Sequence, residues 1–185
     1  MNVTTVLSSF VGSDNAGINT RDFPFTFKIA GPKNKGAVRT ALGAAINTQS
    51  NTDVINAFIQ TQSQDIYAKV GYEWRQPVLR RLNIYYGFDA LASFENEVAD
   101  LITGFDESKI KERRYSFGGG PVYGVQFIIN PKILLSFEGS FYVISSYETE
   151  TESFRSNPSF NTQNESWLLN ADATPPQWMY LIFRF

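Results

Sequence analysis

In the segment ILLSFEGSFYVISSY, from Ile133 to Tyr147, apolar and polar residues largely alternate, and this pattern is the clearest indication of the fold. The apolar set comprises Ile133, Leu135, Phe137, Phe141, Val143 and Tyr147, and the polar set comprises Ser136, Glu138, Ser140, Ser146 and, just beyond, Glu148. Successive side chains of a β-strand point to opposite faces of its sheet. This period of two therefore predicts a strand with one apolar and one polar face.

The same alternation recurs along the whole chain and predicts eight strands. They cover Asn2–Val11, Asp22–Ala30, Ala37–Asn47, Asp65–Arg75, Arg81–Asp89, Tyr115–Ile129, Ile133–Tyr147 and Trp178–Phe185. Short links at Gly31–Gly36, Gln76–Pro77 and Asn130–Lys132 alternate with long links at Gly12–Arg21, Thr48–Gln62, Asn96–Glu112 and Thr149–Gln177. Transmembrane β-barrels have this asymmetry, with short periplasmic turns and longer extracellular loops. We therefore expect an antiparallel up-and-down barrel with both termini on the periplasmic side.

Length and composition limit the number of domains and the classes of function. A chain of 185 residues predicts one domain over residues 1–185. The net charge is only -2, so nucleic acid is not an expected partner. Histidine and cysteine are absent, which excludes Ser-His-Asp and Cys-His catalysis and removes the commonest ligands of zinc. We expect no enzymatic activity, no cofactor and no metal.

The bulk of the side chains predicts which face meets lipid. Aromatic residues make up 15% of the chain and fall mainly on the apolar face, whereas the polar face is rich in glycine. The interior of an eight-stranded barrel is only just wide enough for ordinary side chains, so the aromatic face is expected to point outward. No apolar run is long enough for a transmembrane helix. Met1–Phe10 lacks the pattern of a secretion signal, so we expect such a signal to have been removed.

The chain resembles the small outer-membrane β-barrels of Gram-negative bacteria, in the variety common among the Bacteroidota. The matching stretches are Asn2–Leu7, Ala37–Gly43, Val70–Arg75 with Leu82–Gly87, and Tyr180–Phe185. The resemblance implies outer-membrane lipid as surroundings and the barrel-assembly machinery as a partner during biogenesis. It also implies that the last strand carries the assembly signal, at Met179, Leu181, Phe183 and Phe185. Enzymes with barrels of this size resemble one another in using histidine, which this chain lacks.

Charged residues on the polar face are interpreted as an ion-pair network that fills the interior. Its predicted members are Lys28, Arg39, Lys69, Glu73, Arg75, Arg81, Asp89, Glu138 and Arg184. Each buried charge needs a partner, and eight strands leave no aqueous pore. A conduction path or a binding pocket remains an alternative, as does acid-base catalysis by Asp89 with Glu138. Glu148, Glu150 and Glu152 would offer oxygen ligands to a cation at the rim.

The long links are unusually apolar. Short amphipathic helices are predicted within Thr48–Gln62 and Asn96–Glu112 from their helical spacing. Candidate partner-binding residues are Phe58, Ile59, Leu101, Phe105, Phe154, Phe160 and Trp167, which would otherwise cap their own barrel. We therefore predict a structural or accessory outer-membrane barrel that presents its loops to surface proteins or to a larger complex for secretion, uptake or barrel assembly. A soluble lipocalin-like barrel and a carboxylate-only membrane enzyme remain alternatives.

Overall fold

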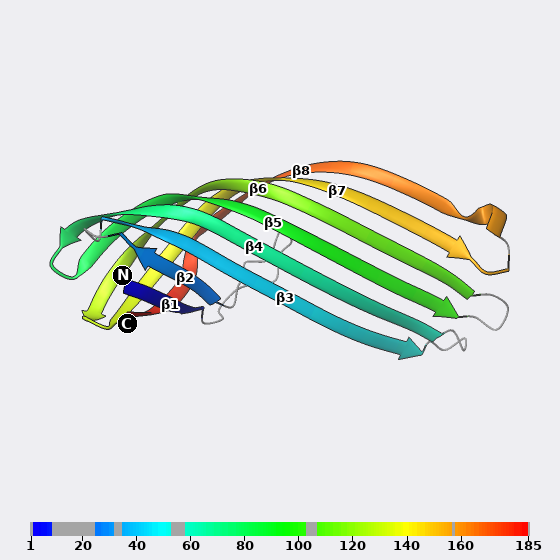
Figure 1. Cartoon of the computed structure of the whole chain (residues 1–185), viewed down its shortest axis with the longest axis horizontal. Helices are drawn as coiled ribbons and strands as arrows, with labels where there is room; N and C mark the ends of the chain where they lie inside the picture. The colour runs from blue at the N-terminus through cyan, green and yellow to red at the C-terminus, as the bar shows by residue number, and fades with distance from the viewer. Residues whose placement is uncertain are drawn as a thin grey trace.

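The computed structural model describes residues 2–8, 25–31, 35–52, 58–102, 107–156 and 158–184. These residues form eight strands in one antiparallel meander (Figure 1). The strands are β1 (Asn2–Ser8), β2 (Phe25–Ala30), β3 (Gly36–Thr52), β4 (Phe58–Leu79), β5 (Leu82–Ile102), β6 (Glu107–Asn130), β7 (Ile133–Phe154) and β8 (Thr162–Arg184). A short 3-10 helix, η2 (Pro158–Phe160), precedes β8. The predicted all-β antiparallel meander of eight strands is thus confirmed.

Each strand pairs with the next one in the chain, and β1 also pairs with β8. The β1–β8 ladder runs from Thr4 opposite Arg184 to Ser8 opposite Tyr180. Every strand therefore has two neighbours over part of its length. Figure 1 shows that β1 begins and β8 ends at the same end of the molecule, beside the short turns.

The long links are a correction to the sequence prediction. Residues expected in loops instead continue the strands, because β3 runs to Thr52, β5 runs to Ile102 and β6 begins at Glu107. Neither predicted helix is found among the described residues of these two segments. Hydropathy alternates along a strand only where its two faces lie in different environments. The alternation is lost where both faces of a strand are exposed to water. The backbone there stays extended because neighbouring strands satisfy its hydrogen bonds.

The connections at the opposite end are tight. The turn between β4 and β5 is Arg80–Arg81, so the predicted turn at Gln76–Pro77 is wrong by a few residues and Pro77 lies inside β4. Pro131–Lys132 joins β6 to β7, and the Asn130 side chain accepts hydrogen bonds from the amides of Lys132 and Ile133. An Asn side chain that binds the backbone two or three residues later is a common device for reversing a chain.

The two faces of the sheet differ as the aromatic bulk predicts. The apolar face is exposed, as shown by Phe27, Tyr72, Trp74, Tyr86, Phe88, Tyr115, Phe117, Tyr123, Phe127, Phe137 and Phe141. The polar face is buried, including the charged residues Lys28, Arg39, Lys69, Glu73, Asp89 and Glu138. Within the part of the chain that the structure describes, no helix is long and apolar enough to cross a membrane. The lipocalin-like alternative requires the reverse arrangement of faces.

Candidate functional site

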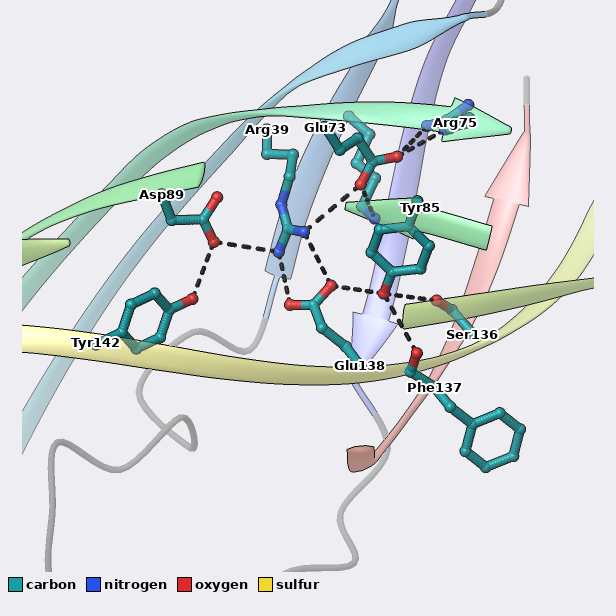
Figure 2. Close-up of polar contacts among 10 residues, drawn as sticks. Arg39, Glu73, Arg75, Tyr85, Asp89, Ser136, Phe137, Glu138 and Tyr142 are labelled. Atoms are coloured by element: carbon teal, nitrogen blue, oxygen red, sulfur yellow. Dashed lines mark hydrogen bonds and ion pairs between the residues drawn. The ribbon is translucent and has the colours of Figure 1, made fainter. Parts of the chain in front are cut away.

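The guanidinium of Arg39 is the centre of the buried polar cluster (Figure 2). It donates two hydrogen bonds to Glu138, with Nη1–Oε2 at 2.9 Å and Nη2–Oε1 at 2.7 Å. It also forms ion pairs with Asp89 at 3.3 Å and with Glu73 at 3.6 Å. Arg39 lies on β3 and Glu138 on β7, which are not neighbours in the sheet, so this contact crosses the interior.

Glu73 is the second hub of the cluster. Its carboxylate accepts a hydrogen bond from Lys28 Nζ at 2.7 Å and from Arg75 Nε at 2.6 Å. Lys28 Nζ also lies 4.9 Å from the centre of the Tyr85 ring. Both Lys28 and Glu73 are almost completely shielded from solvent. Charge-assisted hydrogen bonds of this kind offset the loss of hydration, which is the main cost of burying an ion.

Two tyrosines complete the cluster, and the sequence prediction missed them. Tyr85 donates a hydrogen bond to Glu138 at 2.7 Å and accepts one from Ser136 at 3.0 Å. Tyr142 donates a hydrogen bond to Asp89 at 3.0 Å. Strand parity could have identified both, because Tyr85 and Tyr142 occupy positions that alternate with the outward aromatic residues.

Glycines on the inner face give these side chains room to cross the interior. Gly71 lies between Arg39 and Asp89 in the sheet register. A Cβ at Gly71 would collide with the Asp89 carboxylate. Gly124 lies opposite both Tyr85 and Glu138, and a Cβ there would approach the Tyr85 ring to 2.6 Å. The glycines therefore determine where the large polar side chains fit.

Apolar side chains lie on both sides of the cluster along β7. Leu134 packs with Ile182 at the short-turn end, whereas Ile144 packs with Val122 farther along the strand. The cavity beside Lys28 and Arg39 has a volume of about 10 Å³, enough for roughly one water molecule. The interior at this level is therefore filled by side chains.

The structure brings most of the predicted network together and separates the rest. Lys28, Arg39, Glu73, Arg75, Asp89 and Glu138 are in contact through Arg39 and Glu73. Lys69 is also buried on the inner face and lines the same small cavity. Arg81 is a correction, because it lies exposed in the turn after β4. The backbone of Arg184 pairs with Thr4, and its side chain lies outside the described part of the structure.

A second charged cluster lies on the inner face farther along β5–β7, around Arg114. Its guanidinium contacts Glu95 at 3.1 Å, Glu112 at 2.9 Å and Glu148 at 3.0 Å. Partial burial, together with the nearby carboxylate of Glu148, raises the pKa of Glu112. A cavity of about 60 Å³ borders Arg114 and Asp65. The inner face thus carries a cluster around Arg114 in addition to the one around Arg39.

The acidic residues of β7 show no chelating arrangement. Glu148 is paired with Arg114, and Glu150 and Glu152 follow it along the strand. Within the described ranges, no three Asp and Glu side chains gather closely enough to hold a metal ion.

The candidate partner-binding residues were predicted in loops, and the described ones lie in strands or in η2, which corrects their placement. Phe58 and Ile59 begin β4, and Leu101 lies near the end of β5. Phe154 ends β7, Phe160 lies in η2 and Trp167 lies in β8, where its ring contacts Tyr147. Phe105 is outside the described residues. Those that lie in strands are spread over both faces, because neighbouring side chains of a strand alternate.

The predicted assembly signal lies in β8. Met179 is opposite Phe137, and Leu181 is opposite both Leu7 and Leu135. Phe183 is opposite Thr5 and Ile133, whereas Phe185 falls outside the described residues.

Comparison with protein-family models gives no match, and comparison with curated proteins gives none either. Among solved structures, the chain is similar to a major outer membrane protein from Thermus thermophilus. That similarity has a TM-score of 0.45 and 14% sequence identity, and it covers 100% of this chain and 98% of the other chain.

Proposed function

We propose that this chain is a non-enzymatic, integral outer-membrane protein of a Gram-negative bacterium, built as a closed eight-stranded transmembrane barrel. The observation that carries the proposal is the exposed outer face. In β5 and β6 its outward positions carry no charge from Leu82 to Phe94 or from Tyr115 to Ile129. A protein surrounded by water has little reason to expose so broad an apolar surface, whereas one surrounded by lipid requires it.

Aromatic rows run across the exposed face. In the sheet register, Phe94, Tyr115, Tyr147 and Trp167 lie side by side on β5–β8. A second row, formed by Trp74, Tyr86 and Tyr123, crosses β4–β6 nearer the short turns. Aromatic side chains concentrate at both interfaces of membrane barrels. The first row therefore supports an interface on the side away from the termini.

The apolar band has the height of a bilayer. Tyr115 and Phe127 are 12 residues apart on β6 (127 − 115), which corresponds to about 40 Å of strand at roughly 3.4 Å per residue. A strand tilt of about 40° reduces that length to roughly 30 Å along the membrane normal. The hydrocarbon core of a bilayer is about 30 Å thick.

The filled interior favours a structural or accessory role over a channel. Arg39 and its partners occupy the space through which ions or solutes would pass. The same contacts speak against acid-base catalysis, because Asp89 and Glu138 are both held by Arg39 Nη2. The chain also has no histidine or cysteine.

The long strands support the presentation of a surface to a partner. Beyond the row containing Tyr115, β3–β8 continue as a curved sheet (Figure 1). With both termini on the periplasmic side, this sheet would face the exterior. Surface proteins or a larger complex for secretion, uptake or barrel assembly would then dock there, and the sequence resemblance favours a Bacteroidota host. The barrel-assembly machinery would read the last strand.

Two arginine substitutions on one strand test the membrane setting. Val143 and Thr151 both occupy outward positions of β7, one inside the apolar band and one beyond the aromatic row. In phosphatidylcholine vesicles, V143R should lower the free energy of unfolding in urea by about 2–4 kcal/mol, and T151R by about 0–1 kcal/mol. In a water-soluble protein, the half-exposed Val143 would tolerate arginine about as well as Thr151 does. Equal effects, or failure of the chain to float with vesicles, would contradict the proposal.

A further inference from the structure

Three basic residues occupy alternate positions of β6, near its start at Glu107. Lys109, Lys111 and Arg113 follow the parity of Tyr115, whose side chain is exposed on the outer face. They therefore project from the same face as the aromatic row, and Arg113 is one outward position beyond Tyr115. On the opposite face of the same segment lies the cluster around Arg114. The sheet thus separates a basic outer stripe from an acidic inner cluster.

The neighbours of the stripe leave two of its three cations available. Lys109 forms an ion pair with Asp100 at 3.3 Å. Within the described residues, Lys111 and Arg113 have no ion-pair partner. In the register, Arg113 lies between Asn96 and Thr149, and Lys111 lies between Val98 and Thr151. Amide and hydroxyl donors thus flank the two available cations.

We propose that Arg113 and Lys111, flanked by Thr149 and Thr151, bind the phosphate of an anionic lipid headgroup in the outer leaflet. The inference rests on the proposed membrane setting, which places the row of Tyr115 at the interface and Arg113 at headgroup depth. A guanidinium recognises phosphate through two parallel hydrogen bonds, and an ammonium adds a point charge. The adjacent hydroxyls supply further donors to the phosphate oxygens.

The position favours lipid over an acidic protein. Arg113 lies directly beside the aromatic row, so a large partner would have to displace lipid to reach it. A phospholipid places its phosphate at this depth whenever its chains lie against the apolar band. Basic residues beside a membrane surface attract anionic lipids, and the attraction falls off within a Debye length.

Quenching of Trp167 fluorescence by brominated lipids measures the preference of the site for an anionic phosphate headgroup over phosphatidylcholine. Trp167 is two strands away from β6 in the row of Tyr115, about 10 Å at the usual strand spacing. The W74F/W178F variant retains Trp167 as its one tryptophan. This full-length variant is reconstituted into phosphatidylcholine vesicles that contain brominated phosphatidic acid or brominated phosphatidylcholine. The ratio of the two quenching constants reports the preference for the phosphate monoester headgroup.

We expect roughly a thirtyfold preference for phosphatidic acid, the scale set by two basic residues at a membrane surface at about 1 kcal/mol each. K111Q/R113Q should reduce the ratio to about one, whereas the matched control R80Q/R81Q, in the opposite turn, should leave it unchanged. Added salt should also lower the ratio.

Each other outcome has a distinct meaning. If brominated phosphatidylcholine does not quench Trp167 at all, the chain is not in the bilayer, and the proposed function fails with this inference. If the chain inserts but shows no preference, or if K111Q/R113Q retains it, only the inference fails. If inorganic phosphate abolishes the preference at equal ionic strength, the site binds free phosphate instead of lipid, which overturns the proposal.

Discussion

Arg39 and Arg114 each contact three carboxylates, but they do so in different surroundings. Arg39 pairs with Glu73, Asp89 and Glu138 among buried side chains, and its own side chain is 2% exposed. Arg114 pairs with Glu95, Glu112 and Glu148 in the part of the sheet away from the short turns, and its side chain is 36% exposed. The two sites therefore have the same chemistry and differ mainly in access to water.

Ion pairs between the same residue types therefore contribute different amounts to the free energy of folding at the two sites. Around Arg39, loss of one partner would leave the remaining charges in a medium that solvates them poorly, so the whole cluster depends on each member. Around Arg114, water can replace a lost partner at little cost. Loss of one member should therefore destabilise the cluster around Arg39 strongly, whereas the cluster around Arg114 should tolerate such a loss.

The largest expected effect comes from removing each arginine in turn. R39A leaves three buried carboxylates without their shared partner and should lower the free energy of unfolding by about 3–5 kcal/mol. The matched control R114A should lower it by no more than about 1 kcal/mol, because that site is partly solvated. Urea unfolding of vesicle-inserted protein, followed by tryptophan fluorescence, measures both. Similar losses for the two variants would mean that burial does not distinguish the sites.

A smaller effect is expected from filling the space beside Tyr85. In G124A the new methyl group would meet the Tyr85 ring and the carbonyl oxygen of Phe137, so Tyr85 must shift away from Glu138. Overpacking of this kind should cost about 1–3 kcal/mol. Among the described residues, the new methyl group of the control G31A meets nothing closer than 3.6 Å, and this variant should stay within about 0.5 kcal/mol of the parent. The same unfolding measurement tests this prediction. If G124A had the same free energy of unfolding as the parent, this glycine would not be needed for the network.

The smallest expected effect is the pH dependence of stability that comes from Glu112, beside Arg114. Because partial burial and Glu148 raise the pKa of Glu112 above its value of 4.5 in the unfolded chain, ionisation of Glu112 costs the folded state free energy. That cost is present at neutral pH and disappears as the pH falls through the raised pKa to about 4.5. E112Q should therefore be slightly more stable than the parent at pH 7, with a gain below the effect of R114A.

The difference between E112Q and the parent isolates this one carboxyl, since all other groups titrate in both chains. Unfolding curves between pH 7 and pH 4 measure it. A stability gain that grows as the pH falls would have the wrong sign and would show that Arg114 outweighs burial at Glu112.

Much of the fold was predictable from local pattern. The alternation from Ile133 to Tyr147 assigns the side chains of this part of β7 to a face, and the same parity holds in the paired parts of β6 and β8 except at the register shift between Ile128 and Asn130. The ends of the strands were not predictable in this way. Thr149–Phe154 continues the extended backbone of β7, but its side chains on both faces are polar up to Ser153 and at least partly exposed, so its hydropathy carries no period.

The candidate site was predictable only as a set of inward-facing charges. Parity placed Lys28, Arg39 and Glu138 on the polar face, but no local rule says which of them meet. The partners of Arg39 depend on which strands face each other across the interior and on where glycines leave room.

The antiparallel strands, the assignment of their faces and the absence of histidine and cysteine chemistry therefore follow from residue order and residue type alone. These properties are local, because strand period and residue type need no knowledge of distant neighbours. The contact of Arg39 with Glu138, 99 residues away, and the separate set of carboxylates around Arg114 could be identified only from the folded arrangement. Such contacts span strands that are not sheet neighbours or join distant parts of the chain, so they exist only once the register of every ladder is fixed.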